Sequence, residues 1–131
     1  MVNEAVRDSF KRCETAGDFG ETFYGIFLKK SPQIAELFAE TDFSKQRKHL
    51  RASVFMLVNR DIEDQKTQEV LTGVGNSHSR RKLDIRPELY DIWRQSLCET
   101  VKELDSDWSQ ELESDWQRQV QPGIDFITSL Y

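Results

Sequence analysis

Two histidines are the side chains in this sequence best suited to bind a metal or to move a proton near neutral pH. His78 lies in the polar stretch Asn-Ser-His-Ser-Arg-Arg, where a histidine is usually only solvated. At helical spacing, however, Leu71, Val74 and His78 share one face, so this imidazole would close a stripe that points inward. His78 is therefore a candidate ligand that can also be interpreted as a surface residue.

His49 directly precedes Leu50, the inward residue of its segment, and points about 100° away from it on a helix. We therefore expect His49 at the edge of any pocket and not at its centre. Taken alone, it is more simply interpreted as an exposed basic residue of the run Gln46-Arg47-Lys48-His49. Neither histidine has a Cys, Asp or Glu at metal-ligand spacing, which argues against a zinc site made by the protein alone.

The cysteines are a second kind of reactive side chain, and there are only two, Cys13 and Cys98. Two cysteines do not make a disulfide scaffold. Nothing in the neighbouring sequence would activate either thiol as a nucleophile. We expect both to be reduced and partly buried, as is typical of a cytoplasmic protein.

The elements that must position these residues are predicted to be helices. Apolar residues recur at steps of three and four, and only six Gly and three Pro interrupt the chain. Ser31-Pro32 is a typical helix start, and Asp42 can cap the helix that begins at Phe43. The pattern predicts an all-α fold of about seven helices, at residues 3–15, 18–30, 32–38, 43–60, 64–79, 87–105 and 107–130.

The last two predicted helices are joined by a short Asp-Ser-Asp turn, residues 105–107, and should pack antiparallel. Pro122-Gly123 interrupts the apolar series of the final helix. We expect it to kink that helix or to open it locally.

Length and charge exclude several classes of protein. A chain of 131 residues is enough for one domain, residues 1–131, and not for two. The net charge of −5 argues against a nucleic-acid partner and against an anionic membrane surface. Eight Phe, three Trp and three Tyr are too many aromatics for a disordered chain. The start lacks a secretion signal and the longest uncharged apolar run, Ala52–Val58, is too short to span a bilayer, so we expect a cytoplasmic protein.

Three motifs follow one another along the chain. The first is FYGIFLKKSPQIAELF, residues 23–38, with an aromatic-Tyr pair, a Pro that opens a short helix and a Phe after it. The second is Gln46-Arg47-Lys48-His49-Leu50, and the third is His78 followed by Ile85-Arg86-Pro87-Glu88-Leu89-Tyr90. Their order resembles that of bacterial single-domain globins and of the haem domain of flavohaemoglobins, in which the second motif is similar to the start of the distal helix. The resemblance covers Phe10 to Ile127 and implies a globin fold around haem b.

The resemblance implies a role for each matched position. His78 would be the axial ligand of the haem iron, and Phe38 would stack on the porphyrin. Tyr24 and Gln46 match the distal tyrosine and glutamine, which can donate hydrogen bonds to a ligand on ferrous iron that carries partial negative charge. Leu50 would form the apolar wall above the iron. In any helical bundle, the same Tyr24, Phe38 and Leu50 would simply be buried and Gln46 solvated.

Further haem contacts follow from the same resemblance. His49, with Arg81 or Lys82, would meet the haem propionates at the pocket edge, and Leu83 would help Ile85 to cover the haem. The remaining residues implied to contact haem are apolar: Val54, Val74, Ile85 and Trp93.

Two features depart from the flavohaemoglobin pattern. His78 and Pro87 are nine positions apart, which is a longer spacing than in flavohaemoglobins. The closing stretch Phe126–Tyr131 has no acidic residue where flavohaemoglobins carry the glutamate of their proximal network, although Tyr90 matches the tyrosine of that network. The charge that would push electron density onto the iron is therefore missing.

Three functions remain open from the sequence. The first is a globin that reversibly binds dioxygen and other diatomic ligands, carbon monoxide and nitric oxide among them, for transport or storage. The second is a nitric-oxide dioxygenase, which would need a separate reductase because no flavin or nicotinamide domain occurs in this chain. The third is a globin-like sensor or haem-free interaction module. Each is expected as a monomer or homodimer.

Overall fold

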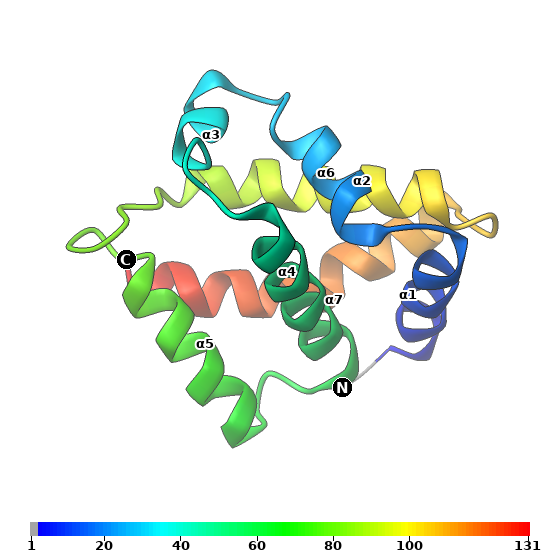
Figure 1. The fold of residues 1–131 in the computed structure, drawn as a ribbon. Coiled ribbons are helices and arrows are strands. Elements are labelled where there is room, and N and C mark those ends of the chain that lie inside the picture. Colours follow the sequence, from blue (N-terminus) through cyan, green and yellow to red (C-terminus); the bar gives the residue numbers. More distant parts are fainter. Residues whose placement is uncertain (1–2) are drawn as a thin grey trace.

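The computed structural model describes residues 3–131, which form seven α-helices and no β-strand (Figure 1). Every predicted helix is present, with its ends within three residues of the predicted positions. The all-α prediction is confirmed. The helices are α1 (Glu4–Ala16), α2 (Phe19–Phe27), α3 (Pro32–Leu37), α4 (Phe43–Asn59), α5 (Gln65–Ser77), α6 (Glu88–Leu104) and α7 (Gln110–Ser129).

At every helix except α6, a side chain at the start accepts a hydrogen bond from a free N–H group of the first turn. The Ser31 hydroxyl accepts from the N–H of Gln33, and Pro32 occupies the first helical position of α3. Asp42 caps α4 by accepting from the N–H of Ser44. Such caps stabilise a helix by about 1 kcal/mol each. Both predicted starts are confirmed.

The core lies where α1, α2, α4, α6 and α7 pack together, with α5 joined to it through α7. α6 and α7 run antiparallel, as predicted (Figure 1). Trp116, Phe19 and Phe23 are the largest fully buried side chains. Burying each aromatic ring contributes about 2–3 kcal/mol, so these rings help to hold α2 and α7 in the core.

Gly20 and Gly75 lie at close contacts between segments of the fold. A methyl group on Gly20 of α2 would lie 2.8 Å from Cβ of Arg47 on α4. A methyl group on Gly75 of α5 would lie 2.7 Å from Cδ1 of Leu130. The absent side chains therefore set how near α2 lies to α4 and how near α5 lies to the end of α7.

α7 continues as one helix from Gln110 to Ser129 through Pro122. Pro122 has no N–H, so it cannot bond the carbonyl of Arg118 one turn earlier. The local loss of this bond does not end the helix, because packing on both sides of Pro122 holds it.

A buried carboxylate anchors α1 to the turn between α6 and α7. Asp105 is 2% exposed and accepts hydrogen bonds from Arg12 Nε at 2.7 Å and from the Ser9 hydroxyl at 2.6 Å. The indole N–H of Trp116 donates to the same Ser9 oxygen at 3.0 Å. The backbone N–H of Asp107 completes the set at 2.9 Å.

Cys13 and Cys98 are free thiols and both are buried. Burial raises the pKa of Cys13 to about 12 and that of Cys98 to about 11. Both therefore stay protonated at neutral pH, and they pack as small apolar groups. Within residues 3–131, no helix is long and apolar enough to cross a bilayer.

Candidate functional site

Tyr24 and Gln46 meet between α2 and α4. Gln46 Nε2 donates a hydrogen bond to the Tyr24 hydroxyl oxygen at 2.9 Å. This bond uses the oxygen as an acceptor and leaves the hydroxyl hydrogen free to donate to a ligand. The close contact between Gly20 and Arg47 brings the two helices near enough for the pair to form.

Aromatic rings from α2, from α4 and from the residue that follows α3 surround Tyr24. Its ring lies edge-on to Phe38, with centroids 5.6 Å apart, and to Phe43, with centroids 5.4 Å apart. Phe27 contacts both Tyr24 and Phe38. Sequence reasoning placed Phe38 at this site but assigned no role to Phe43, because a residue at the start of a helix gives no signal of which ring it will meet.

Burial controls the protonation of Tyr24. Its pKa is raised because burial disfavours the phenolate, and the hydrogen bond from Gln46 opposes this only in part. Tyr24 is therefore a neutral hydrogen-bond donor over the physiological pH range. Leu50 and Val54 continue the Gln46 face of α4 and are both buried, so the polar pair lies next to an apolar wall.

His78 lies at the C-terminal end of α5, where its N–H bonds the carbonyl of Val74 at 2.9 Å. Its side chain is half-buried. The imidazole Nδ1 and the hydroxyl of Tyr90 are 2.9 Å apart and hydrogen-bonded, and the two rings are stacked. This bond engages one ring nitrogen and leaves Nε2 as the nitrogen available to a metal.

The surroundings keep both partners neutral. Burial lowers the pKa of His78, so the imidazole is uncharged at neutral pH, as a metal ligand must be. Burial raises the pKa of Tyr90 to about 12. Within residues 3–131, no carboxylate forms a hydrogen bond or ion pair with either ring. The pair therefore lacks a negative charge, in agreement with the sequence of the closing stretch.

The chain between α5 and α6, residues 79–86, folds back onto His78. The N–H of Ile85 bonds the carbonyl of His78 at 2.9 Å, and Asp84 has a φ of 51°, in the left-handed region. Ile85 is half-buried and packs against the core. Leu83 is 60% exposed, so it does not provide the cover that the resemblance implies. The longer spacing between His78 and Pro87 is taken up by this loop.

The other predicted site residues differ in burial. Trp93 is half-buried, and its ring lies 5.9 Å from that of Phe23. Val74 is half-buried one turn before His78. His49, Arg81 and Lys82 are exposed, which suits either a pocket edge or a solvated surface.

Gln46, the partner of Tyr24, lies on α4, and His78 lies at the end of α5. These two helices do not pack closely on one another. α7 packs against both and crosses them (Figure 1). A cavity of about 360 Å³ lies between α4 and α5 near the connection that joins them. It is lined from α4 by Ala52, Ser53 and Met56 and from α5 by Lys66, Thr67 and Val70.

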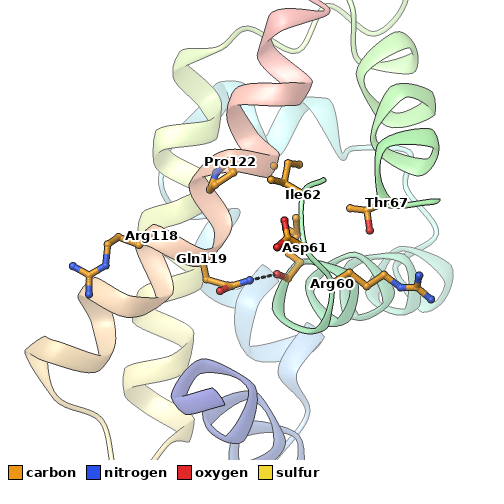
Figure 2. A pocket seen from close by; sticks show the side chains of 9 residues that line it. Arg60, Asp61, Ile62, Thr67, Arg118, Gln119 and Pro122 are labelled. Carbon is orange, nitrogen blue, oxygen red and sulfur yellow. Dashed lines mark hydrogen bonds between the residues drawn. The ribbon is translucent and has the colours of Figure 1, made fainter. Parts of the chain in front are cut away.

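A smaller cavity of about 150 Å³ lies at the end of α4, against α7 (Figure 2). Gln119 borders it and donates to the carbonyl of Leu57 at 2.9 Å. The buried Thr67 hydroxyl also lines it and makes no hydrogen bond to residues 3–131. Arg60 and Arg118 point away from each other at its two sides (Figure 2). None of the predicted site residues lines this cavity.

The residues that the structure describes do not form a metal site made of side chains alone. No three His, Cys, Asp or Glu side chains among residues 3–131 converge on one point. What the fold presents is a single imidazole on α5 and a phenol–amide pair between α2 and α4.

The seven helices, the imidazole of His78 and the Tyr24–Gln46 pair together define the class of protein to which this chain belongs. The sequence matches the globin family over residues 21–122, and the chain belongs to that family.

Among solved structures, the chain is similar to the protein PA3967 from Pseudomonas aeruginosa PAO1, whose crystal structure is described as structurally highly homologous to a human hemoglobin. The two are 39% identical, with a TM-score of 0.87, over 98% of this chain and 96% of that one. No curated protein matches the sequence. The globin resemblance inferred from the motifs is thereby confirmed.

Proposed function

We propose that this chain binds haem b and that the loaded protein reversibly binds dioxygen and other diatomic ligands. The observation that carries the proposal is the bond between His78 Nδ1 and Tyr90, which fixes the imidazole and leaves Nε2 available. Its neutral state and half-buried position suit an axial ligand of iron. Haem iron would supply the site at which the diatomic ligand binds.

Two groups of residues would have different roles, one around His78 and one around Tyr24. His78 would hold the iron, and Tyr90 would orient His78. Tyr24 would donate a hydrogen bond to the partial negative charge of the ligand, and Gln46 would hold the Tyr24 hydroxyl in place. Leu50 would keep water from the ligand, since it is buried on the same face of α4.

Haem would also contact apolar and cationic side chains. Phe38, next to Tyr24, is half-buried and is offered as the ring that stacks on the porphyrin. The exposed His49 is offered as the partner of the propionates, whereas Arg81 and Lys82 are exposed on the loop that follows His78. The other proposed contacts are Val54, Val74, Ile85 and Trp93.

The visible spectrum tests this proposal. The chain is expressed with haem supplied, reduced, and measured before and after addition of carbon monoxide. We expect an intense Soret band that shifts sharply with carbon monoxide. A folded, helical but colourless protein would refute haem binding and would favour a haem-free interaction module. If His78→Ala retained full haem content with an unchanged spectrum, the proposed axial ligand would be wrong.

Nitric-oxide dioxygenation remains a second candidate because the Tyr24–Gln46 pair suits it equally. The absence of a carboxylate on the His78–Tyr90 pair argues for the binding function instead. The two differ in turnover. Repeated consumption of nitric oxide with an added reductant would favour the enzyme, whereas a single stoichiometric burst would favour the binder.

A further inference from the structure

The loop of residues 79–86 concentrates positive charge on a chain that is acidic as a whole. The loop has a net charge of +3, while the whole chain has −5 and the residues outside the loop therefore have −8. The field near the loop is thus opposite in sign to that of the remaining molecule. Its four basic residues, all exposed, are Arg80, Arg81, Lys82 and Arg86.

The only acid of the loop is held by another side chain. The Tyr131 hydroxyl donates a hydrogen bond to Asp84, and the Arg80 guanidinium lies over the Tyr131 ring at 4.8 Å. Arg81 and Lys82, by contrast, form no ion pair with any residue in the described range 3–131. Their charges are therefore free to meet a partner.

The backbone keeps these cations in a defined position. The N–H of Leu83 bonds the carbonyl of Ser77 at 3.2 Å, and the N–H of Asp84 bonds the carbonyl of Ser79 at 2.9 Å. The loop projects from the side of the molecule beside the end of α7 (Figure 1). A fixed, projecting loop loses little conformational entropy when a partner binds.

An apolar side chain lies among the cations. Leu83 is 60% exposed, the most exposed of the large hydrophobic side chains within residues 3–131. An apolar contact surrounded by charge is the usual composition of a protein interface, with the charges steering the approach. The complementary surface is acidic around an apolar patch.

We propose that residues 79–86 form the docking surface for an acidic protein that carries one electron and reduces ferric haem. This rests on the proposed haem function. The loop begins directly after His78, and the N–H of Ile85 bonds the carbonyl of His78. A partner bound to the loop would therefore lie close to His78. The carrier is oxidised by one electron, iron(III) becomes iron(II), and no bond in the chain forms or breaks.

An anionic membrane is the less suitable partner for the same cations. Bringing a flat anionic surface to the loop would also bring it near the −8 carried by the other residues. A folded partner contacts a smaller area and can confine its acidic surface to the loop. We therefore expect a protein, and not a membrane, as the partner of the loop.

The test compares two double variants with the same change in charge. Arg81→Gln/Lys82→Gln alters the loop, whereas Lys11→Gln/Lys29→Gln alters exposed lysines on α1 and after α2. Haem content is measured first for each. Reduction of the ferric protein by a plant-type [2Fe–2S] ferredoxin, an acidic one-electron donor, is then followed by stopped flow at low and high salt.

We expect the loop variant to be reduced about tenfold more slowly at low salt and to lose most of the salt dependence. The control variant should change less than about twofold. Photoreduced lumiflavin, which is uncharged, should reduce all three proteins at equal rates. Equal slowing of both double variants by ferredoxin would overturn the proposal, because net charge and not the loop would then be responsible.

Calorimetric titration with oxidised ferredoxin measures docking without electron transfer. We expect binding to weaken in the loop variant and to persist in the control. Binding to phosphatidylglycerol vesicles without binding to ferredoxin would overturn the proposal in favour of a membrane. A chain that takes up no haem would refute the proposed function, whereas the titration of that same chain would still decide whether the loop docks an acidic protein.

Discussion

Nδ1 of His78, at the end of α5, is hydrogen-bonded to the hydroxyl of Tyr90 in the first turn of α6 at 2.9 Å. The bond joins two helices across the loop of residues 79–86. Because the ring can rotate only by breaking this bond, Tyr90 sets the direction in which Nε2 points. The orientation of the imidazole proposed as the axial ligand is thus determined by a residue twelve positions away.

Tyr90→Phe should loosen haem without removing its ligand. The variant deletes the partner of His78 Nδ1, and loss of such a partner lowers metal affinity by about tenfold or more. Haem transfer to an excess of apomyoglobin should therefore be faster, and the iron–histidine vibration should shift. The control variant Tyr24→Phe removes the hydroxyl oxygen of a different tyrosine and should leave the iron–histidine vibration unchanged. An unchanged transfer rate in Tyr90→Phe would show that the bond does not position His78.

Tyr24→Phe should speed dioxygen dissociation. A hydrogen bond in a dry pocket contributes about 1–3 kcal/mol, which corresponds to roughly 5- to 150-fold in the off-rate. Stopped-flow displacement measures it directly. Carbon monoxide carries little negative charge, so its dissociation should change far less. If the dioxygen off-rate were unchanged, the Tyr24 hydroxyl would not reach the ligand.

Gly20→Ala should separate α2 from α4. The added methyl would lie 2.8 Å from Cβ of Arg47 and 3.3 Å from its Cα, neither of which can move without the backbone. Such overpacking costs about 1–3 kcal/mol of the free energy of unfolding. Gly25→Ala, on the same helix, meets nothing within 4 Å and should stabilise by about 0.4–1 kcal/mol. Urea denaturation separates the two. Equal effects would mean that the α2–α4 contact is adaptable.

Asp105→Asn should destabilise the corner between α1, α6 and α7. Burial raises the pKa of Asp105, but the hydrogen bonds from Arg12 and Ser9 outweigh it and leave the pKa below its ordinary value of 3.8. Loss of the charged acceptor should cost about 2 kcal/mol at pH 7 in urea denaturation. Asp107→Asn, at an exposed carboxylate, should cost less than about 0.5 kcal/mol.

The pH dependence of that contribution has a definite sign. Since folding lowers the pKa of Asp105, its stabilisation is complete above the ordinary value of 3.8 and is lost as pH falls through the lowered folded value. Between pH 7 and pH 5 the difference between wild type and Asp105→Asn should stay constant, and it should shrink only in stronger acid. A difference that disappeared near pH 6 would point to another group.

Helix starts and buried faces could be predicted from the sequence because they depend on neighbours close in the chain. Ser31 and Asp42 cap helices through N–H groups two residues away, and Leu50 and Val54 share a face because four positions make about one turn. The order of the aromatic-Tyr pair, Gln46 and His78 was enough to indicate a globin, which the family match confirms.

Contacts between distant side chains could not be predicted in the same way. The Phe43 ring against Tyr24, the Tyr131 bond to Asp84 and the Ser9–Asp105 pair all depend on how whole helices are placed. Nor could the sequence indicate that Leu83 would be exposed. Its loop has extra residues whose path is fixed by backbone bonds, among them those to Ser77 and His78.

The sequence by itself determined seven helices, the caps Ser31 and Asp42, and the motifs that resemble a globin. The helices and the two caps arise from the period of the helix and from local hydrogen bonds. The tertiary structure decided that Gln46 bonds Tyr24, that Tyr90 holds His78, and that Asp84 is taken by Tyr131, leaving the basic loop exposed. These pairings follow from the close approach of α2 to α4 and of α5 to α7. The small size of Gly20 and Gly75 permits this approach, which forms only when the core is packed.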